Sequence, residues 1–335
     1  MRKYTHFLLI GVICFLCSCE GNSNTTNEPY AVIFDTDVGN DIDDVLALQM
    51  LFNYEKKNMI ELLGITIGKC NPYSIQYVDA YCRLNNRGDI PLGFAYNGVN
   101  PEDNKYLRPT LDTLINGNRI LVPKRSINDS VPEGYKLMRK LLASQKDSSV
   151  IIIAVGPETN LARLLNSGPD EFSNLDGRAL VEKKVVLLSV MGGLYGNEFD
   201  FPEWNIIQDL DAAQTVFSEW PTKLVASGWE VGNKLLYPHQ SVVNDFNFDH
   251  PLRVSYALYD TMPFDRPTWD LTSVLYAVEQ DKAYFDLSSK GNIKIDEEGK
   301  SIFTEDENGL HHYLIHAESN KDFVLNSLVE AVTSN

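Results

Sequence analysis

The sequence has few cysteines, no excess of basic residues and no long apolar run beyond its amino terminus. Only two of its five cysteines, Cys70 and Cys82, lie after residue 19, and we expect them to remain unbridged. A formal net charge of −17 without a basic cluster argues against a nucleic-acid polymer as a partner. Beyond residue 19 no stretch is long and apolar enough to cross a bilayer, so we predict a soluble mature domain.

The first 19 residues have the pattern of an export signal. Arg2 and Lys3 are basic, and the apolar run 7–16 is too short to span a membrane as a mature helix. The sequence LCSC at 16–19 resembles the lipobox of bacterial lipoproteins, with Cys19 as the lipidated residue; a plain secretory signal peptide is the alternative. Residues 20–29 are polar and predict a flexible tether. We therefore expect export and attachment to a bacterial membrane only through lipid, on the periplasmic or cell-surface side.

Residues 30–335 show no internal linker, repeat or low-complexity segment, so we predict one domain. Apolar runs expected to form buried strands lie at 31–34, 60–66, 150–155, 185–190 and 223–226. Helical stretches lie at 45–52, 74–86, 132–145, 159–165, 210–218 and 320–331, with Asn53 as the expected stop of the first. The alternation predicts an α/β fold with a mostly parallel central sheet flanked by helices. Residues 292–316 instead suggest a small antiparallel region, and 97–125 a long surface loop.

The stretch 30–52 concentrates acidic residues between an expected strand and an expected helix. Its five carboxylates are Asp35, Asp37, Asp41, Asp43 and Asp44. Such charges repel one another in a partly dry crevice, so either they keep their protons or a cation binds. Carboxylate oxygens favour a hard cation, Ca²⁺ or Mg²⁺. In the alternative interpretation these acids only cap the helix and its turn, which accounts for two or three of them but not for five.

The acidic motif DTDVGNDIDDVLAL resembles the amino-terminal signature of the inosine–uridine nucleoside hydrolase family, which is usually DTDPGxDDAxA. Val38 replaces the proline of that signature, and two extra residues precede Asp43 and Asp44. Phosphatases of the haloacid dehalogenase type also begin with a strand and D-x-D. The assignment therefore depends on the motifs that follow.

Three further motifs occur in the family's order. Residues 154–162, AVGPETNLA, resemble its GPLTNLA motif, and residues 191–205 contain MGG, GN and EWN, which resemble its MGG, GN and EFN. Residues 266–272, RPTWDLT, contain WD where nucleoside-cleaving members usually have His before Asp. A haloacid dehalogenase would supply none of the three. The resemblance covers most of the chain after residue 30 and implies a Rossmann-like nucleoside hydrolase fold.

The resemblance also implies roles for the matching residues. A cage for Ca²⁺, with Mg²⁺ less favoured, would consist of Asp37, Asp44, the carbonyl of Thr159 and Asp270. Asp37 would in addition act as the general base toward a metal-bound water. Groups that would contact the substrate are Asp43, Asn197, Glu203, Asn205 and Trp269. Asp35 would support the loop, whereas Asp41 and Glu230 receive no role.

The predicted function is metal-dependent hydrolysis of the N-glycosidic bond in ribonucleosides or related ribosides, with release of base and ribose. Trp269 occupies the position of the family's histidine, which protonates the departing base, and an indole cannot transfer a proton. The residue that replaces this acid is not identified by the sequence. A lipoprotein that binds ribosides without cleaving them is therefore the second hypothesis. A small riboside is the expected partner in both, and homo-oligomerisation and base preference stay open.

Overall fold

The computed structural model describes residues 1, 28–100, 105–126, 128–196 and 198–334. The expected lipidation site Cys19, most of the tether and the site residue Asn197 lie outside these ranges. Among the described residues, no helix is both long and apolar enough to cross a membrane. Cys70 and Cys82 are free thiols, as expected.

A ten-stranded sheet forms the centre of the structure, in the order β13-β12-β14-β8-β7-β6-β1-β2-β3, with β11 paired to β14. The parallel part contains β1 (Tyr30–Thr36), β2 (Ile60–Lys69), β3 (Leu92–Val99), β6 (Val150–Ala154), β7 (Val185–Met191) and β8 (Leu224–Ser227). The carboxyl-terminal part contains β11 (Asp286–Leu287), β12 (Gly291–Ile295), β13 (Ser301–Glu305) and β14 (His311–Ile315), which pair antiparallel among themselves. β14 joins the main sheet by parallel pairing with β8. The predicted mostly parallel sheet with a small antiparallel region is confirmed.

The helices connect and cover these strands. They are α1 (Asp43–Lys56), α2 (Pro72–Leu84), α3 (Leu107–Asp112), α4 (Gly134–Ser144), α5 (Thr159–Leu165), α6 (Gly177–Lys184), α7 (Trp204–Gln208), α8 (Leu210–Glu219), α9 (Trp229–Lys234), α10 (His239–Asp245), α11 (Pro251–Tyr259), α12 (Trp269–Val278) and α13 (Lys321–Thr333), with a 3₁₀ turn at Glu318–Asn320. Two short antiparallel strand pairs complete the structure: β4 (Leu114–Ile115) with β5 (Asn118–Arg119), and β9 (Leu236–Tyr237) with β10 (Arg266–Pro267).

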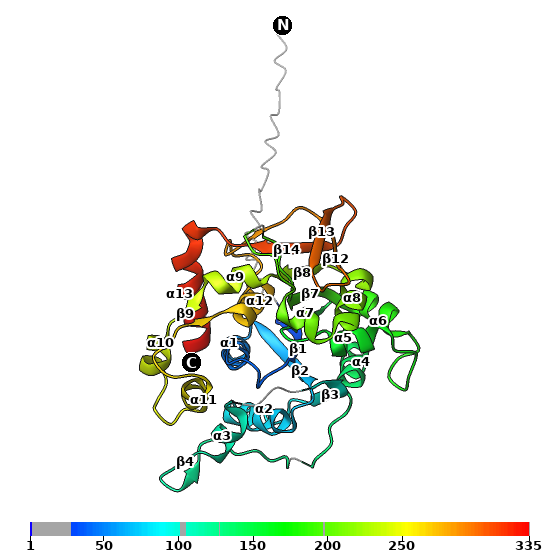
Figure 1. The fold of residues 1–335 in the computed structure, drawn as a ribbon. Helices are drawn as coiled ribbons and strands as arrows, with labels where there is room; N and C mark the ends of the chain where they lie inside the picture. The colour runs from blue at the N-terminus through cyan, green and yellow to red at the C-terminus, as the bar shows by residue number, and fades with distance from the viewer. Residues whose placement is uncertain (2–27, 101–104, 127, 197, 335) are drawn as a thin grey trace.

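The sheet is buried on both faces by helices. Successive side chains of a strand point to opposite sides, so each strand contributes to two cores. In β1, Val32 and Phe34 pack into the core that includes α1, α12 and α13. Ala31 and Ile33 pack into a second core, formed with α4, α5, α6 and α8. Figure 1 shows these two groups of helices on opposite sides of the sheet. The near-continuous apolar runs in the sequence follow from this two-sided burial.

Helix α1 lies at the centre of the first core and is buried from Asp43 to Tyr54. The predicted stop at Asn53 is wrong, since the helix continues to Lys56. The buried Asn53 amide donates to the carbonyl oxygens of Ala331 (3.0 Å) and Val332 (2.8 Å) near the end of α13. Its polar group is thus satisfied by another helix and does not compete with the backbone of α1.

The expected surface loop at 97–125 contains more structure than predicted. β3 extends into it as far as Val99, α3 follows, and β4 and β5 form a hairpin. Asn116 and Gly117 connect these two strands with positive φ angles of 53° and 79°. An Asn-Gly pair is a strong hairpin signal, because both residues tolerate this backbone conformation. The sequence therefore held the information for this turn.

Candidate active site

The acidic loop lies at the carboxyl end of β1, where the order in which the chain adds strands to the sheet reverses. The chain adds β2 and β3 on one side of β1, and β6, β7 and β8 on the other. Loops that diverge from such a switch point leave a crevice in which α/β proteins bind ligands. The position of the acidic residues therefore follows from the order of the strands.

Hydrogen bonds hold the loop in place. Gly39 has a φ of +117°, which favours glycine, and its N–H donates to the hydroxyl of Tyr106 (2.9 Å). The same hydroxyl donates to the carbonyl of Asp41 (2.6 Å). The hydroxyl of Thr36 accepts from the N–H of Val38 (3.1 Å) and donates to the carboxylate of Asp44. The carboxylate positions are thus set before any ligand arrives.

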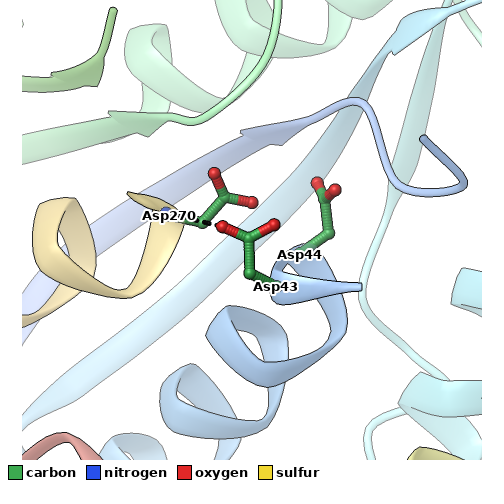
Figure 2. Close-up of side chains that lie close together, drawn as sticks. All are labelled: Asp43, Asp44 and Asp270. Carbon is green, nitrogen blue, oxygen red and sulfur yellow. Dashed lines mark hydrogen bonds between the residues drawn. The ribbon is translucent and has the colours of Figure 1, made fainter. Parts of the chain in front are cut away.

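Three carboxylates converge from the first turns of two helices. Asp43 and Asp44 begin α1, and Asp270 lies in the first turn of α12. One oxygen from each lies within 4.8 Å of the others, and all three residues are buried. Figure 2 shows this arrangement, in which the N–H of Asp270 donates to Asp43 Oδ2 over 3.1 Å. Partial positive charge at both helix starts favours negative groups at this point.

The charges of this cluster are unfavourable without a cation. Burial raises the pKa of Asp43, Asp44 and Asp270 well above the ordinary value, and repulsion from neighbouring aspartates raises it further. Within the described structure, Asp44 Oδ2 is buried and has no hydrogen-bond partner. Converging buried carboxylates with such an oxygen fit a hard divalent cation, which would favour their ionised form.

Asp37, the predicted general base, lies beside a lysine that the sequence reasoning missed. Lys69 is the last residue of β2, and its Nζ lies 3.1 Å from Asp37 Oδ2, with both side chains buried. A Cβ on Gly156 would lie 2.7 Å from the Cβ of Asp37, so glycine lets the turn after β6 approach closely. The only sequence signal for this ion pair is a charged residue at the end of the apolar run IELLGITIGK.

Thr159 does not line the cavity that contains the carboxylates. Thr159 begins α5, and its hydroxyl donates to Asp209; both residues line a separate cavity of about 710 Å³. Val155, four residues earlier, lines the acidic cavity together with Asp37. The backbone at the end of β6, rather than the start of α5, therefore faces the predicted metal site.

The acidic cavity has a volume of about 440 Å³. Its carboxylate side is formed by Asp37, Asp43, Asp44 and Asp270. Its aromatic side is formed by Trp229, Tyr259 and Trp269, which contact one another or the cations Lys105 and Arg266; the carboxylate of Asp41, paired with Arg266, lies there too. The remaining lining residues include Trp204, Glu203 and Asn205. A cavity with one ionic and one aromatic side can hold a ligand that has a polyhydroxy part and a flat apolar part.

Glu203 and Asn205 are buried at the start of α7. The carboxylate of Glu203 accepts from the N–H groups of Gly193, Asn205 and Ile206, so it caps this helix. Burial raises the pKa of Glu203 to about 7, although these N–H groups oppose the shift. The side-chain amide of Asn205 donates to the carbonyls of Val155 and Met191. Both predicted substrate contacts thus line the cavity and also organise its wall.

Trp269 lies on the aromatic side, and the single hydrogen-bond donor of its side chain is already used. Its Nε1 donates to the carbonyl of Trp229 over 2.9 Å, and the two rings lie 6.1 Å apart at 31°. The guanidinium of Arg266 lies 5.1 Å from the Trp269 ring centroid. Trp269 therefore presents aromatic surface to a ligand and neither a free N–H nor a proton.

Asp35 and Glu230 do not line this cavity, whereas Asp41, which also received no role from the sequence, does. Asp35 accepts hydrogen bonds from Thr66 and Asn160 and so connects β1 with β2 and α5. Glu230 lines a different cavity, of about 280 Å³, next to His316.

Comparisons with known proteins confirm the resemblance carried by the four motifs. A family model described as inosine-uridine preferring nucleoside hydrolase matches residues 32–321. The pyrimidine-specific ribonucleoside hydrolase RihA of Citrobacter koseri is 27% identical over 212 residues, which cover 61% of this chain and 61% of that relative. A second RihA, from Enterobacter sp., is 25% identical with the same coverage. The chain thus spans about three fifths of the length of the curated relatives it matches.

Solved structures agree on the fold. A plant nucleoside hydrolase, PpNRh1, superposes with a TM-score of 0.68 at 17% identity, covering 92% of this chain and 100% of that one. A purine-preferring ribonucleoside hydrolase from Gardnerella vaginalis gives a TM-score of 0.68 at 18% identity, covering 90% and 98%. The mostly parallel sheet flanked by helices is therefore the nucleoside hydrolase fold.

Proposed function

Because the chain belongs to the inosine-uridine preferring nucleoside hydrolase family, we propose that it hydrolyses the N-glycosidic bond of a ribonucleoside or related riboside. The products are the free base and ribose. The observation that carries this proposal is the cavity itself, in which converging buried carboxylates lie beside aromatic rings. The carboxylate side suits a cation and sugar hydroxyls, and the aromatic side suits a flat aglycone.

The residues that would hold the cation are Asp37, Asp44 and Asp270, with the carbonyl of Val155 in place of Thr159 as a neutral oxygen ligand. We expect Ca²⁺ rather than Mg²⁺, since a set of carboxylate and carbonyl oxygens suits its flexible coordination. When bound, such an ion lowers the pKa of a coordinated water. Asp37 would take the proton of the attacking water as general base.

The remaining polar groups would position the sugar. Asp43 lies in the cluster and would accept a hydrogen bond from a ribose hydroxyl, while Glu203 and Asn205 line the same cavity at the start of α7. Cleavage of a glycosidic bond builds positive charge on the sugar in the transition state. The carboxylate side would favour that charge because its groups are fixed and largely shielded from water.

A reducing-sugar assay over a panel of ribosides, with and without a chelator, tests this function. We expect ribose release from at least one riboside, its loss after chelation and its recovery when Ca²⁺ is restored. The Asp37→Asn variant serves as the control for contaminating activity. Binding of ribosides without any release of ribose would contradict hydrolysis and favour the non-catalytic alternative.

A further inference from the structure

Two cations lie on the aromatic side of the cavity, against the same ring. Lys105 Nζ is 4.6 Å and the Arg266 guanidinium carbon is 5.0 Å from the ring centroid of Tyr259. Both residues line the cavity. The chain as a whole is acidic, with 29 Lys and Arg residues against 46 Asp and Glu. Two neighbouring cations at one ligand cavity therefore form a local exception.

Among the described residues, only one of these two charges is paired with a carboxylate. Arg266 Nε donates to Asp41 Oδ1 over 2.8 Å, and its Nη2 contacts the second oxygen of that carboxylate. Asp41 belongs to the two extra residues of the acidic loop, so the insertion fixes the guanidinium beside the cavity. Lys105 is exposed, and within the described residues no carboxylate lies at ion-pair distance from its Nζ. The three side chains together carry a net charge of +1.

The aromatic side thus has two cations beside the single carboxylate of Asp41, while the indole N–H of Trp269 is occupied by the carbonyl of Trp229. A flat neutral base placed here would find stacking surface, but its substituents would meet cations. An anionic substituent would gain charge-assisted hydrogen bonds, which are about twice as strong as neutral ones. This side of the cavity, unlike its carboxylate side, is therefore most complementary to an anionic substituent on the aromatic part of the ligand.

We propose that the aromatic side selects ribosides whose aromatic aglycone carries a carboxylate, with Lys105 and Arg266 as the specificity-determining residues. This inference rests on the proposed function, because it assigns the carboxylate side to the sugar. It adds a substrate class that the family assignment does not contain. The two-residue insertion would then contribute to specificity, since its Asp41 positions Arg266.

The test uses two ligands that differ in charge but hardly in shape, 3-carboxyphenyl and 3-carbamoylphenyl riboside. Their dissociation constants are measured by calorimetry, and their kcat/KM values by ribose release, in Ca²⁺-containing buffer. We expect the full protein to bind the carboxylate at least about tenfold more tightly, the scale of one charge-assisted hydrogen bond. The kcat/KM ratio should favour the same ligand.

Two variants and one control locate the preference. Lys105→Met should reduce the affinity ratio severalfold, and the charge-balanced pair Arg266→Gln with Asp41→Asn should do the same. Lys140→Met is the matched control, because Lys140 also lies over an aromatic ring, Phe172, at 6.0 Å but does not line the cavity. The control should keep the ratio of the unmodified protein.

Equal affinity for the two ligands, or a ratio that Lys105→Met leaves unchanged, would overturn the inference. Tighter binding of the carboxylate without hydrolysis of either ligand would support it and would count against the proposed function. Hydrolysis of both ligands at equal kcat/KM and with equal affinity would support the proposed function and overturn the inferred preference for a carboxylate. The two proposals can therefore fail separately.

Discussion

The two sides of the cavity are built in different ways. The carboxylate side comes from one loop at the end of β1 and from the first turns of α1 and α12, and it is buried. The aromatic side is assembled from α9, α11, β10, the first residue of α12 and Lys105, which is exposed. The proposed catalytic carboxylates are thus buried, whereas the two cations proposed to select ligands are less buried. This division predicts large effects on one side and graded effects on the other.

The largest effect expected of a single substitution is on the carboxylate side, at Asp37. Asp37→Asn keeps the size of the side chain and one oxygen but removes the base. We expect kcat on a good riboside to fall by roughly 10²- to 10⁴-fold, the usual value of a general base, with little change in sugar affinity. Steady-state kinetics and calorimetry of ribose binding measure the two quantities. A loss confined to KM would show that Asp37 only positions the substrate.

Lys69 tests how strongly the carboxylate side depends on a charge from the protein. Lys69→Met removes the partner of a buried carboxylate, and breaking such a pair typically costs about 3 kcal/mol or more. We expect a drop of that size in the free energy of unfolding of chelated protein, measured by urea denaturation. Added Ca²⁺ should stabilise the variant more than the unmodified protein. An unchanged response to Ca²⁺ would mean that Lys69 does not share the charge of the metal site.

The raised pKa of Glu203 leads us to expect that the free energy of unfolding depends on pH. Its carboxyl has a pKa of about 7 in the folded protein, because burial raises it from 4.5. Below pH 4.5 the group is protonated in both states; as the pH rises toward 7, only the unfolded state releases the proton, so stability falls. The loss from this group is about 3 kcal/mol, at about 1.4 kcal/mol per pKa unit.

The Glu203→Gln variant should remove this part of the pH dependence. The free energy of unfolding is measured in chelator between pH 4.5 and pH 7 for both proteins. Glu297→Gln, at an exposed turn, is the control and should follow the unmodified protein. Parallel curves for Glu203→Gln and the unmodified protein would show that Glu203 is not held protonated in the fold.

Metal removal should have the smallest effect on stability but a complete effect on activity. A cation that binds only the folded state stabilises it by about 2.7 kcal/mol at a hundred times its dissociation constant. We therefore expect chelation to lower the Tm by several degrees, and Ca²⁺ to restore it. Elemental analysis of protein purified without chelator should find a divalent cation. Its absence, with a Tm that does not respond to Ca²⁺, would contradict the cage.

The sequence indicated most of the carboxylate side because three of its four carboxylates are nearly contiguous, whereas Asp270 was named only through the family resemblance. Asp37, Asp43 and Asp44 lie in one motif, and the alternation of strands and helices placed that motif at a strand end. The distinction between Thr159 and Val155 was not accessible, since both lie in one strand-to-helix turn and only the folded backbone shows which faces the cavity.

The aromatic side and Lys69 depend on tertiary structure. Trp229, Tyr259 and Arg266 lie in three separate segments, and no local pattern indicates that they share a cavity. Lys69 ends an apolar strand, and its partner is determined by the pairing of β2 with β1. The strand β3 was also missed, since its run LGFAYNGV is interrupted by glycine and asparagine. By contrast, the Asn116-Gly117 turn could have been read from the sequence.

The central claim is that the carboxylate side supports cleavage while Trp269, at the position of the family's acid, offers no proton to the departing base. The most direct test compares kcat for 4-nitrophenyl riboside, whose phenolate departs without a proton, with kcat for inosine, whose base requires one. Because the N–H of Trp269 is bound to the carbonyl of Trp229, we predict that inosine is slower by roughly 10²-fold or more, the scale of one lost acid. Comparable kcat values for the two substrates would show that another residue supplies the proton and would contradict this account.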